Sequence, residues 1–339
     1  MNVKELNSVA KAMVANGKGI LAADESGGTI KKRFDTIGTE STEENRRRYR
    51  EMLFTANGVA DYIGGVILFD ETIRQSTSDG VPFAKYLNDL GMIAGIKVDK
   101  GAKSLAGFPG ETITEGLDGL RERLNEYVGL GAKFSKWRAV INIGEGIPTD
   151  FCLRANAHAL ARYAALCQEA GLVPIVEPEV LMDGDHSIER CAEVTSRALE
   201  LVFNELKEHR VELPGIVLKP NMVISGTDAQ NRAGPEQVAR ATLDVLKKHV
   251  PSEVPGIAFL SGGQSAEEAT EHLGLMNQMG PLPWELSFSY GRALQAPALD
   301  AWRGKEEQFE AGQKALYKRA RLNSLAHLGK YDTQMESAA

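Results

Sequence analysis

The stretches Leu172–Val180 (LVPIVEPEV) and Gly215–Val223 (GIVLKPNMV) decide the fold class. Each is a short apolar run without polar alternation, which is typical of a parallel strand covered on both faces. Six similar runs recur, each followed by a longer stretch of helical composition: Gly19–Asp24, Tyr62–Asp70, Met92–Asp99, Phe134–Ile143, Gly256–Gly263 and Trp284–Gly291. Eight strands separated by helices predict an α/β protein with a single (β/α)8 TIM barrel.

The segments between these runs carry helix signals. Residues 1–18 form an amphipathic pattern, and Ser41-Thr42-Glu43-Glu44 predicts a capping box before a helix over 45–54. Further helices are expected over 150–170, which stops at Gly171, and over 187–208, 234–249 and 305–328. The barrel should therefore carry extra N- and C-terminal helices.

Domain organisation follows from the absence of a linker-like stretch in the sequence. We expect one catalytic domain over residues 1–330 and a short flexible C-terminal tail over 331–339. The alternative is a doubly wound open sheet, which would need a Gly-rich first turn such as GxGxxG. No such turn follows the first strand.

Composition excludes several classes of protein. The chain has 39 Lys and Arg against 46 Asp and Glu, a net charge of −7, which disfavours non-specific nucleic-acid binding. Three cysteines argue for a reducing compartment rather than a disulfide framework. The sequence shows no targeting signal, and its apolar runs are far too short to span a membrane. We therefore expect a cytoplasmic protein with no nucleic-acid or membrane partner.

Polar residues collect at the ends of the predicted strands, where barrel enzymes place their active sites. The strand-end residues are Asp24, Asp70, Lys97, Lys136 with Arg138, Glu177 with Glu179, Lys219, Ser261 and Arg292. One buried charged residue taken alone usually belongs to a structural ion pair, because burying a charge without a partner is costly. Eight strand ends that converge by fold favour a working site over a purely structural network.

Lys219 lies inside the apolar strand IVLKP. A lysine there loses hydration, which favours its neutral form, and a neutral amine can attack a carbonyl and form a Schiff base. The alternative is a strand-end lysine whose ammonium reaches water. Glu177 and Glu179 share one side of their strand, so both carboxylates can enter the barrel mouth as an acid and a base. The alternatives for this pair are a charged rim or metal ligation.

The remaining cations indicate an anionic substrate. Lys136, Arg138 and Lys97 would form a positive pocket with Lys219 on an acidic protein, although Arg/Glu networks are an alternative. Phosphate-binding loops commonly follow strands seven and eight of this fold. Those positions hold Ser261-Gly262-Gly263 and Gly291-Arg292, which supply exposed backbone N–H groups and a guanidinium.

A second anion site is less distinct. Thr29, Lys32 and Arg33 follow the first strand and either hold an anion or lie on a solvated helix face. Arg46 belongs to a basic run that we expect to lie mostly on a solvated helix surface. Of this run, Arg46 could reach a ligand, but only weakly.

Other chemistries lack their signatures in the sequence. Six histidines form no HxxxH or HxH pair, and neither a GxSxG elbow nor a P-loop occurs. We expect neither a metal nor a cofactor.

The motifs together resemble those of class I (Schiff-base) fructose-bisphosphate aldolases over roughly residues 5–331. The matching stretches, in order, are GKGILAADES (17–26), GTESTEENRRRYR (38–50), GIKVDKG (95–101), KWR (136–138), PIVEPE (174–179), LKPNMV (218–223), FLSGGQS (259–265) and FSYGRALQ (288–295). The resemblance implies a (β/α)8 barrel that cleaves fructose 1,6-bisphosphate without a metal. It also implies a homotetramer.

The resemblance carries roles onto individual residues. Lys219 matches the Schiff-base lysine, Glu177 the general acid/base and Glu179 its acidic neighbour. Asp24 and Lys136 match residues around the scissile C3–C4 bond, and Lys97 and Arg138 match positive substrate contacts. The C1-phosphate site is matched by Ser261, Gly262, Gly263, Ser289, Gly291 and Arg292, and residues near the C6-phosphate by Thr29, Lys32, Arg33 and Arg46.

The C-terminus departs from the eukaryotic members of this family, which end in a tyrosine that assists C3 proton exchange. This chain ends QMESAA, and its last tyrosine is Tyr331. Lys219, Glu177 or water is therefore expected to move that proton. The competing functions are another Schiff-base barrel lyase, such as a transaldolase, and a binding or scaffold protein that has kept the fold.

Overall fold

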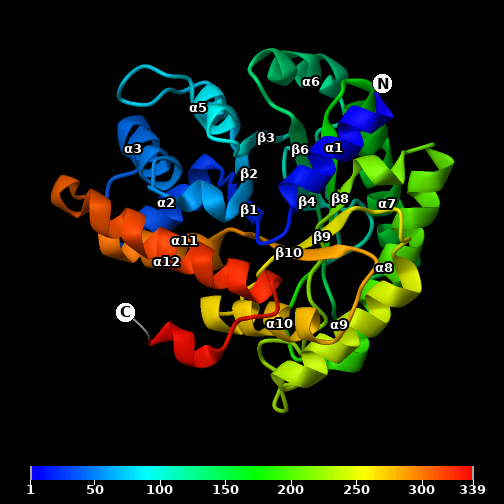
Figure 1. Cartoon of the computed structure of the whole chain (residues 1–339). Coiled ribbons are helices and arrows are strands. Elements are labelled where there is room, and N and C mark those ends of the chain that lie inside the picture. Colours follow the sequence, from blue (N-terminus) through cyan, green and yellow to red (C-terminus); the bar gives the residue numbers. More distant parts are fainter. Residues whose placement is uncertain (1, 338–339) are drawn as a thin grey trace.

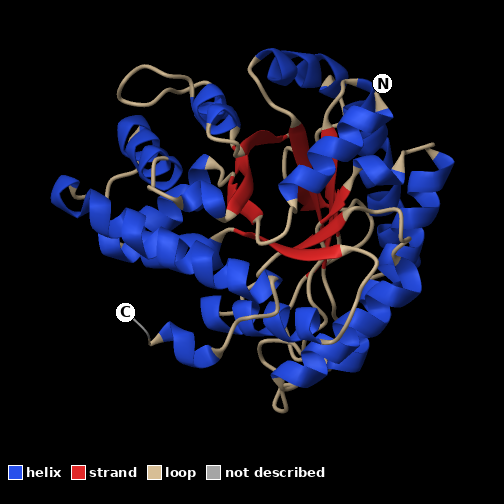
Figure 2. Cartoon of the chain, viewed as in Figure 1, coloured by secondary structure: helices blue, strands red, loops and turns tan. Residues whose placement is uncertain are grey.

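The protein is described by a computed structural model that covers residues 2–337. Eight parallel strands close into a barrel in the order β1-β10-β9-β8-β7-β6-β3-β2, drawn in red at the centre of Figure 2. The strands are β1 (Gly19–Ala23), β2 (Ile63–Leu68), β3 (Ile93–Lys97), β6 (Phe134–Ile141), β7 (Val173–Val180), β8 (Val217–Leu218), β9 (Gly256–Phe259) and β10 (Glu285–Tyr290). Pairing of β1 with β10 closes the ring, so the predicted barrel is confirmed.

Helices surround the ring of strands (Figure 1). They are α1 (Val3–Met13), α2 (Gly27–Thr36), α3 (Glu43–Phe54), α4 (Asp70–Ile73), α5 (Phe83–Asp89), α6 (Leu120–Gly129), α7 (Asp150–Glu169), α8 (Ile188–Glu208), α9 (Pro235–His249), α10 (Ala266–Gln278), α11 (Arg292–Trp302) and α12 (Phe309–His327). The expected extra helices are α1, which precedes the first strand, and α12, which follows the last βα unit. Within residues 2–337, no helix has the length and apolar character needed to cross a membrane.

Helix α1 closes the end of the barrel at which the strands begin. Its residues Leu6, Ala10 and Met13, with Val14 directly after the helix, join one apolar cluster with inward-facing strand residues such as Ile20 and Val217. Glycines at the start of β9 and β2 show how close this contact is. A Cβ at Gly256 would lie 2.4 Å from Val14, and one at Gly64 would lie 2.7 Å from the Met13 carbonyl oxygen. The sealed apolar end leaves the opposite end, where the strands finish, for polar chemistry.

Small and large residues are matched across the barrel interior. Gly95 of β3 lies opposite Phe134 of β6, and a Cβ at Gly95 would lie 2.2 Å from the Phe134 ring. Phe134 is fully buried. The ring therefore occupies the space that any larger residue at position 95 would need, and glycine is required there by packing rather than by backbone conformation.

The structure differs from the sequence-based expectation at two places. The cap of α3 is Thr42, whose hydroxyl accepts from the Asn45 N–H at 3.1 Å, and not the expected Ser41–Glu44 box. The Ser41 carbonyl instead accepts from Arg46. An antiparallel hairpin of β4 (Ala102–Ser104) and β5 (Thr112–Thr114) was not predicted at all. Its strands are short and its side chains carry little apolar periodicity, so it is held by tertiary bonds from Thr112 and Thr114 to carbonyls of β6.

The loop after β9 is held in place by a buried polar pair, Gln264 and His272. Gln264 donates through Nε2 to the Ser261 carbonyl at 2.9 Å, and its Oε1 lies 2.6 Å from Nδ1 of His272 on α10. Burial lowers the pKa of His272 from 6.5 to about 4. His272 is therefore neutral at physiological pH and donates from Nδ1 to the glutamine, which fixes the loop.

The last described residues pack against the barrel's outer helices. Arg319 of α12 is buried and binds both carboxylate oxygens of Glu336 at 2.7 Å. Tyr331 is buried as well and donates to the same carboxylate at 2.8 Å. Residues 338–339 of the expected flexible tail lie outside the described residues.

The close packing of Gly95 against Phe134 predicts that a methyl group added at position 95 lowers the free energy of unfolding. Gly95→Ala should destabilise the protein by roughly 1–3 kcal/mol, because the new methyl overpacks the barrel interior. Gly129→Ala is the matched control, since it ends α6, is exposed and has open space around its Cβ. Urea unfolding midpoints measure both variants. Equal midpoints for the two variants would contradict the packing argument.

The His272–Gln264 pair predicts a pH dependence of stability. The unfolded histidine binds a proton near pH 6.5 and the folded one near 4, so stability is complete above pH 6.5 and falls as the pH drops toward 4. Between pH 7 and 5 the loss from this group should be about 2 kcal/mol. His272→Gln keeps an amide donor but does not titrate, so its unfolding free energy should fall less over this range. If the unfolding free energies of the variant and the parent protein fall equally between pH 7 and 5, His272 is not the group responsible.

Candidate active site

A cavity of about 1550 Å³ opens at the carboxyl ends of the barrel strands. Every residue that the sequence analysis placed in the site lines this cavity, with the single exception of Arg46. The lining includes Asp24, Thr29, Lys32, Arg33, Lys97, Lys136, Arg138, Glu177, Glu179, Lys219, Ser261, Gly262, Gly263, Ser289, Gly291 and Arg292. Residues from opposite ends of the chain meet there because the closed barrel brings all strand ends to one rim.

Four buried charges of alternating sign form the centre of the cavity. Lys219 Nζ lies 3.1 Å from Glu177 Oε1, Lys136 Nζ lies 3.3 Å from Glu177 Oε2, and Lys136 Nζ lies 2.8 Å from Asp24 Oδ2. The side chains of Lys219 and Lys136 are each only 5% exposed. Glu177 thus bridges two amines, and its two oxygens face different lysines.

The register of the strands explains this arrangement. Lys97 of β3 lies opposite Lys136 of β6, and Arg138 of β6 lies opposite Glu177 of β7. Residues two apart on a strand point to the same side, so Lys136 and Arg138 both enter the cavity. Lys219 directly follows the short strand β8, and its N–H donates to the Val176 carbonyl on β7, which places its amine beside Glu177.

Glu177 and Glu179 do not form the carboxylate pair that the sequence suggested. Arg138 binds Glu179, whereas Glu177 contacts the two lysines. Each carboxylate therefore has its own cation, and a shared proton between the two glutamates is not needed. Lys97 is similarly bound to Asp99, which also accepts from the Arg138 N–H.

Electrostatics set the charge states of two residues in the central network. Burial opposes the charge on Lys136, but the carboxylates of Asp24, Glu177 and Asp99 outweigh it and raise its pKa. Burial likewise favours the neutral form of Asp24, but Lys136, Lys219 and Lys97 hold the pKa of Asp24 well below its usual range. Lys136 is therefore a permanent cation and Asp24 a permanent anion at neutral pH.

One end of the cavity has the features of a phosphate site. Gly262 and Gly263 have φ values of +47° and +81°, a conformation that glycine adopts without strain and that frees backbone N–H groups. Arg292 begins α11, whose N-terminus favours an anion. The Ser289 hydroxyl is buried without a partner among the described residues, so a ligand oxygen would satisfy it.

The second cationic group lies on α2, after the first strand. Lys32 is exposed, and Arg33 binds the buried carboxylate of Glu25. Arg46 on α3 points elsewhere: its guanidinium binds Glu71 through two nitrogens, at 2.6 and 2.7 Å. This pairing argues against the ligand contact expected for Arg46, because most of its donors are already used.

Glu25 and Gln295 are site residues that the sequence analysis missed. Glu25 is 5% exposed in its side chain and binds both Arg33 and Arg50, while Gln295 donates to it at 2.8 Å. Glu25 directly follows Asp24, so it points away from the central lysines and toward the helices behind them. The only signal for it was this position at a strand end. Its effect is to fix Arg33 at the rim of the cavity.

Comparison with known proteins gives a consistent result. The sequence model of the family described as "Fructose-bisphosphate aldolase class-I" matches residues 5–339. The chain is 60% identical over 332 residues to "Probable fructose-bisphosphate aldolase class 1" from Xanthomonas campestris pv. campestris, covering 98% of this chain and 99% of that protein. It is 52% identical over 331 residues to "Fructose-bisphosphate aldolase C" from Homo sapiens, covering 97% and 91%.

A solved structure agrees as well. The fructose-bisphosphate aldolase from Plasmodium falciparum, in complex with TRAP and a small molecule inhibitor, matches with a TM-score of 0.96 and 50% sequence identity. The match covers 97% of this chain and 96% of that chain. The chain therefore belongs to the class I fructose-bisphosphate aldolase family and is a lyase.

Proposed function

We propose that this chain cleaves fructose 1,6-bisphosphate to dihydroxyacetone phosphate and glyceraldehyde 3-phosphate, with Lys219 as the Schiff-base lysine. The observation that carries the assignment is the position of the Lys219 amine. It is buried at the centre of a cationic cavity, 3.1 Å from a carboxylate that can take its proton. A neutral amine in that place can attack the C2 ketone of the open-chain sugar.

Glu177 serves each proton transfer in turn. It accepts the proton of the Lys219 ammonium, and the free amine then adds to C2 to give a carbinolamine. The protonated Glu177 returns the proton to the C2 hydroxyl, water leaves, and an iminium forms. The carboxylate regenerated in this step then removes the proton of the C4 hydroxyl.

Carbon–carbon cleavage follows from the iminium. As the C4 oxygen forms a carbonyl, the electron pair of the C3–C4 bond moves into the iminium and leaves an enamine on Lys219. Glyceraldehyde 3-phosphate departs. Protonation of the enamine at C3 and hydrolysis by water release dihydroxyacetone phosphate and restore the amine.

Asp24 and Lys136 act as a fixed ion pair beside this chemistry. The lowered pKa of Asp24 makes it a weak base, so we assign it the role of orienting Lys136 and a substrate hydroxyl. Lys136 keeps its charge throughout and stabilises the developing alkoxide at C4. Lys97 and Arg138 supply further positive contacts, and Glu179 holds Arg138 in place.

Two separate anion sites support a bisphosphate substrate over the transaldolase alternative. We assign the C1-phosphate to Ser261, Gly262, Gly263, Ser289, Gly291 and Arg292, and the C6-phosphate to Thr29, Lys32 and Arg33. Gripping both ends positions the reacting carbons, an effect worth up to about 7–11 kcal/mol. The intact set of buried lysines and carboxylates speaks against a purely binding or scaffold role.

Location and assembly are also proposals. We propose a cytoplasmic enzyme, supported by three free, buried cysteines and by a relative from Arabidopsis thaliana named "Fructose-bisphosphate aldolase 4, cytosolic", 52% identical over 338 residues. We further propose a homotetramer, on family membership. The substrate is a phosphorylated sugar, with no nucleic-acid or membrane partner.

The Schiff base predicts where reduction will trap the substrate. Borohydride treatment with dihydroxyacetone phosphate should attach one adduct to Lys219, located by peptide mass spectrometry, and abolish activity. Lys219→Met should form no adduct and lose at least about 10³-fold in kcat. Lys103→Met, an exposed lysine on β4, is the control and should behave as the parent. An adduct on another residue, or cleavage that survives trapping, would overturn the mechanism.

The two anion sites predict a separation between substrates. Lys32→Gln should raise KM for fructose 1,6-bisphosphate by about 10-fold, the typical loss of a charged hydrogen bond, and leave fructose 1-phosphate turnover unchanged. Arg292→Gln should impair both substrates, because both carry the C1-phosphate. Steady-state kinetics with the two sugars checks this. If Lys32→Gln impairs the two sugars equally, the C6 assignment is wrong.

A further inference from the structure

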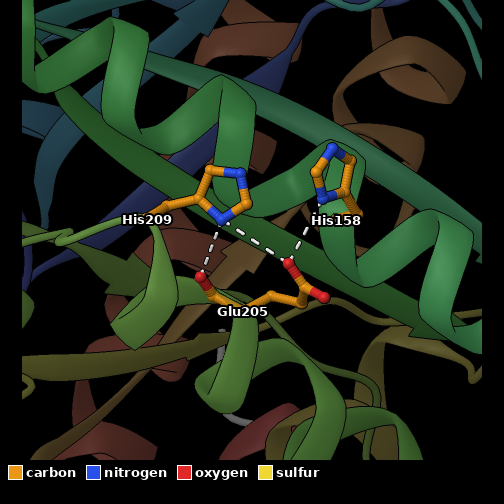
Figure 3. A group of neighbouring side chains, drawn as sticks. All are labelled: His158, Glu205 and His209. Carbon is orange, nitrogen blue, oxygen red and sulfur yellow. Dashed lines mark hydrogen bonds and ion pairs between the residues drawn. The ribbon is translucent and has the colours of Figure 1, made fainter.

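Three metal-ligating side chains converge on the outer helical layer, away from the barrel mouth (Figure 3). His158 lies on α7, Glu205 lies in the last turn of α8, and His209 follows that helix directly. None of the three lines the catalytic cavity. Helices α7 and α8 pack side by side, which brings the two imidazoles to a centroid distance of 4.9 Å.

The two donor-atom distances at Glu205 fit a tetrahedral metal, and all three donor groups lie within 4.8 Å of one another. Glu205 Oε2 lies 3.3 Å from His158 Nδ1 and 3.5 Å from His209 Nδ1. Zinc ligands lie about 2.0–2.2 Å from the ion, so neighbouring donor atoms of a tetrahedral site are about 3.3–3.6 Å apart. Both contacts fall on this edge length, with the carboxylate oxygen shared between them.

The charge of the group also suits a divalent cation. Among residues 2–337, Glu205 has no lysine or arginine within ion-pair distance, and its only such contacts are the two histidines. Two imidazoles and one carboxylate are ligands typical of zinc. The side chains of His158, Glu205 and His209 are 56%, 30% and 22% exposed, so an ion can enter from solvent and keep water at a fourth position.

A hydrogen bond that His209 already makes limits the affinity of the group for a metal ion. His209 Nδ1 also lies 2.9 Å from the Glu205 backbone carbonyl, a contact in which the ring donates its proton. Coordination through Nδ1 requires a deprotonated nitrogen and replaces that hydrogen bond. We therefore expect binding weaker than that of a closed four-ligand structural site.

We propose that His158, Glu205 and His209 form a Zn²⁺-binding site that links α7 to α8 on the surface of the barrel. The site is independent of the Schiff-base chemistry, because it shares no residue with the cavity. Its ligands come from two helices, so no short sequence motif reveals it: only the one-turn spacing of Glu205 and His209 is visible in the sequence. Zinc held there clamps the two helices together.

The test is calorimetric titration of the tag-free, metal-stripped full chain with ZnCl2. The parent protein should bind one equivalent per chain, with a dissociation constant on the order of 10 µM. His158→Gln and His209→Gln should each weaken binding about tenfold or more, as loss of a ligand demands. Glu208→Gln is the control: it changes an exposed residue at the same helix end without touching a donor atom, and it should bind as the parent does.

A second measurement separates the site from adventitious binding. Zinc should raise the Tm of the parent and of Glu208→Gln, and it should leave the Tm of the double variant His158→Gln/His209→Gln unchanged. The proposal is overturned if the parent shows no saturable zinc binding. It is equally overturned if the double variant binds zinc with the parent's affinity or gains the same Tm.

Discussion

The structure depends on a chain of four buried charges that alternate in sign: Lys219, Glu177, Lys136 and Asp24. Removing such groups from water is costly, and the cost is offset only when each charge has a well-placed opposite charge. Two ammonium groups and two carboxylates give this group of four side chains no net charge. Loss of any one member leaves an uncompensated charge in the interior, so these side chains must be positioned together by the strands that carry them.

A closed barrel meets that requirement because its two ends differ. At the end where the strands begin, α1 and matched pairs such as Gly95 and Phe134 exclude water with apolar contacts. At the other end the strands stop one after another around a rim, and each contributes a side chain to the same cavity. The apolar end supplies the stability and rigidity that allow the charged end to hold its geometry.

Much of this could be predicted from the sequence because the signals are local. Apolar runs gave all eight strands, and reading the ends of those runs gave the lysines and carboxylates of the cavity. The two-residue period of a strand also placed Lys136 and Arg138 on one side. The features that the sequence did not show depend on tertiary partners instead. The guanidinium of Arg46 is bound by Glu71, and the unpredicted β4–β5 hairpin is held by threonine hydroxyls bonded to β6.

Glu25 shows a further limit of reading strand ends. It adjoins Asp24 just after the end of β1, yet Asp24 binds Lys136 whereas Glu25 binds Arg33 and Arg50. The sequence shows two acidic residues side by side and does not show which arginines they meet. That information lies in the tertiary structure, where α2 carries Arg33 and α3 carries Arg50 to Glu25.

Counter-charge, rather than burial, distinguishes the two lysines at the centre. The side chains of Lys219 and Lys136 are equally buried, each only 5% exposed. Lys136 contacts the carboxylates of Asp24 and Glu177, and together with Asp99 they raise its pKa, which keeps it protonated. Lys219 has a single carboxylate within ion-pair distance among the described residues, and that carboxylate is shared with Lys136. Lys219 therefore faces fewer counter-charges than Lys136, and the Lys136 cation lies on the other oxygen of the same carboxylate. The same network that holds Lys136 charged thus gives Lys219 the fewer counter-charges, as the nucleophilic role proposed for it requires.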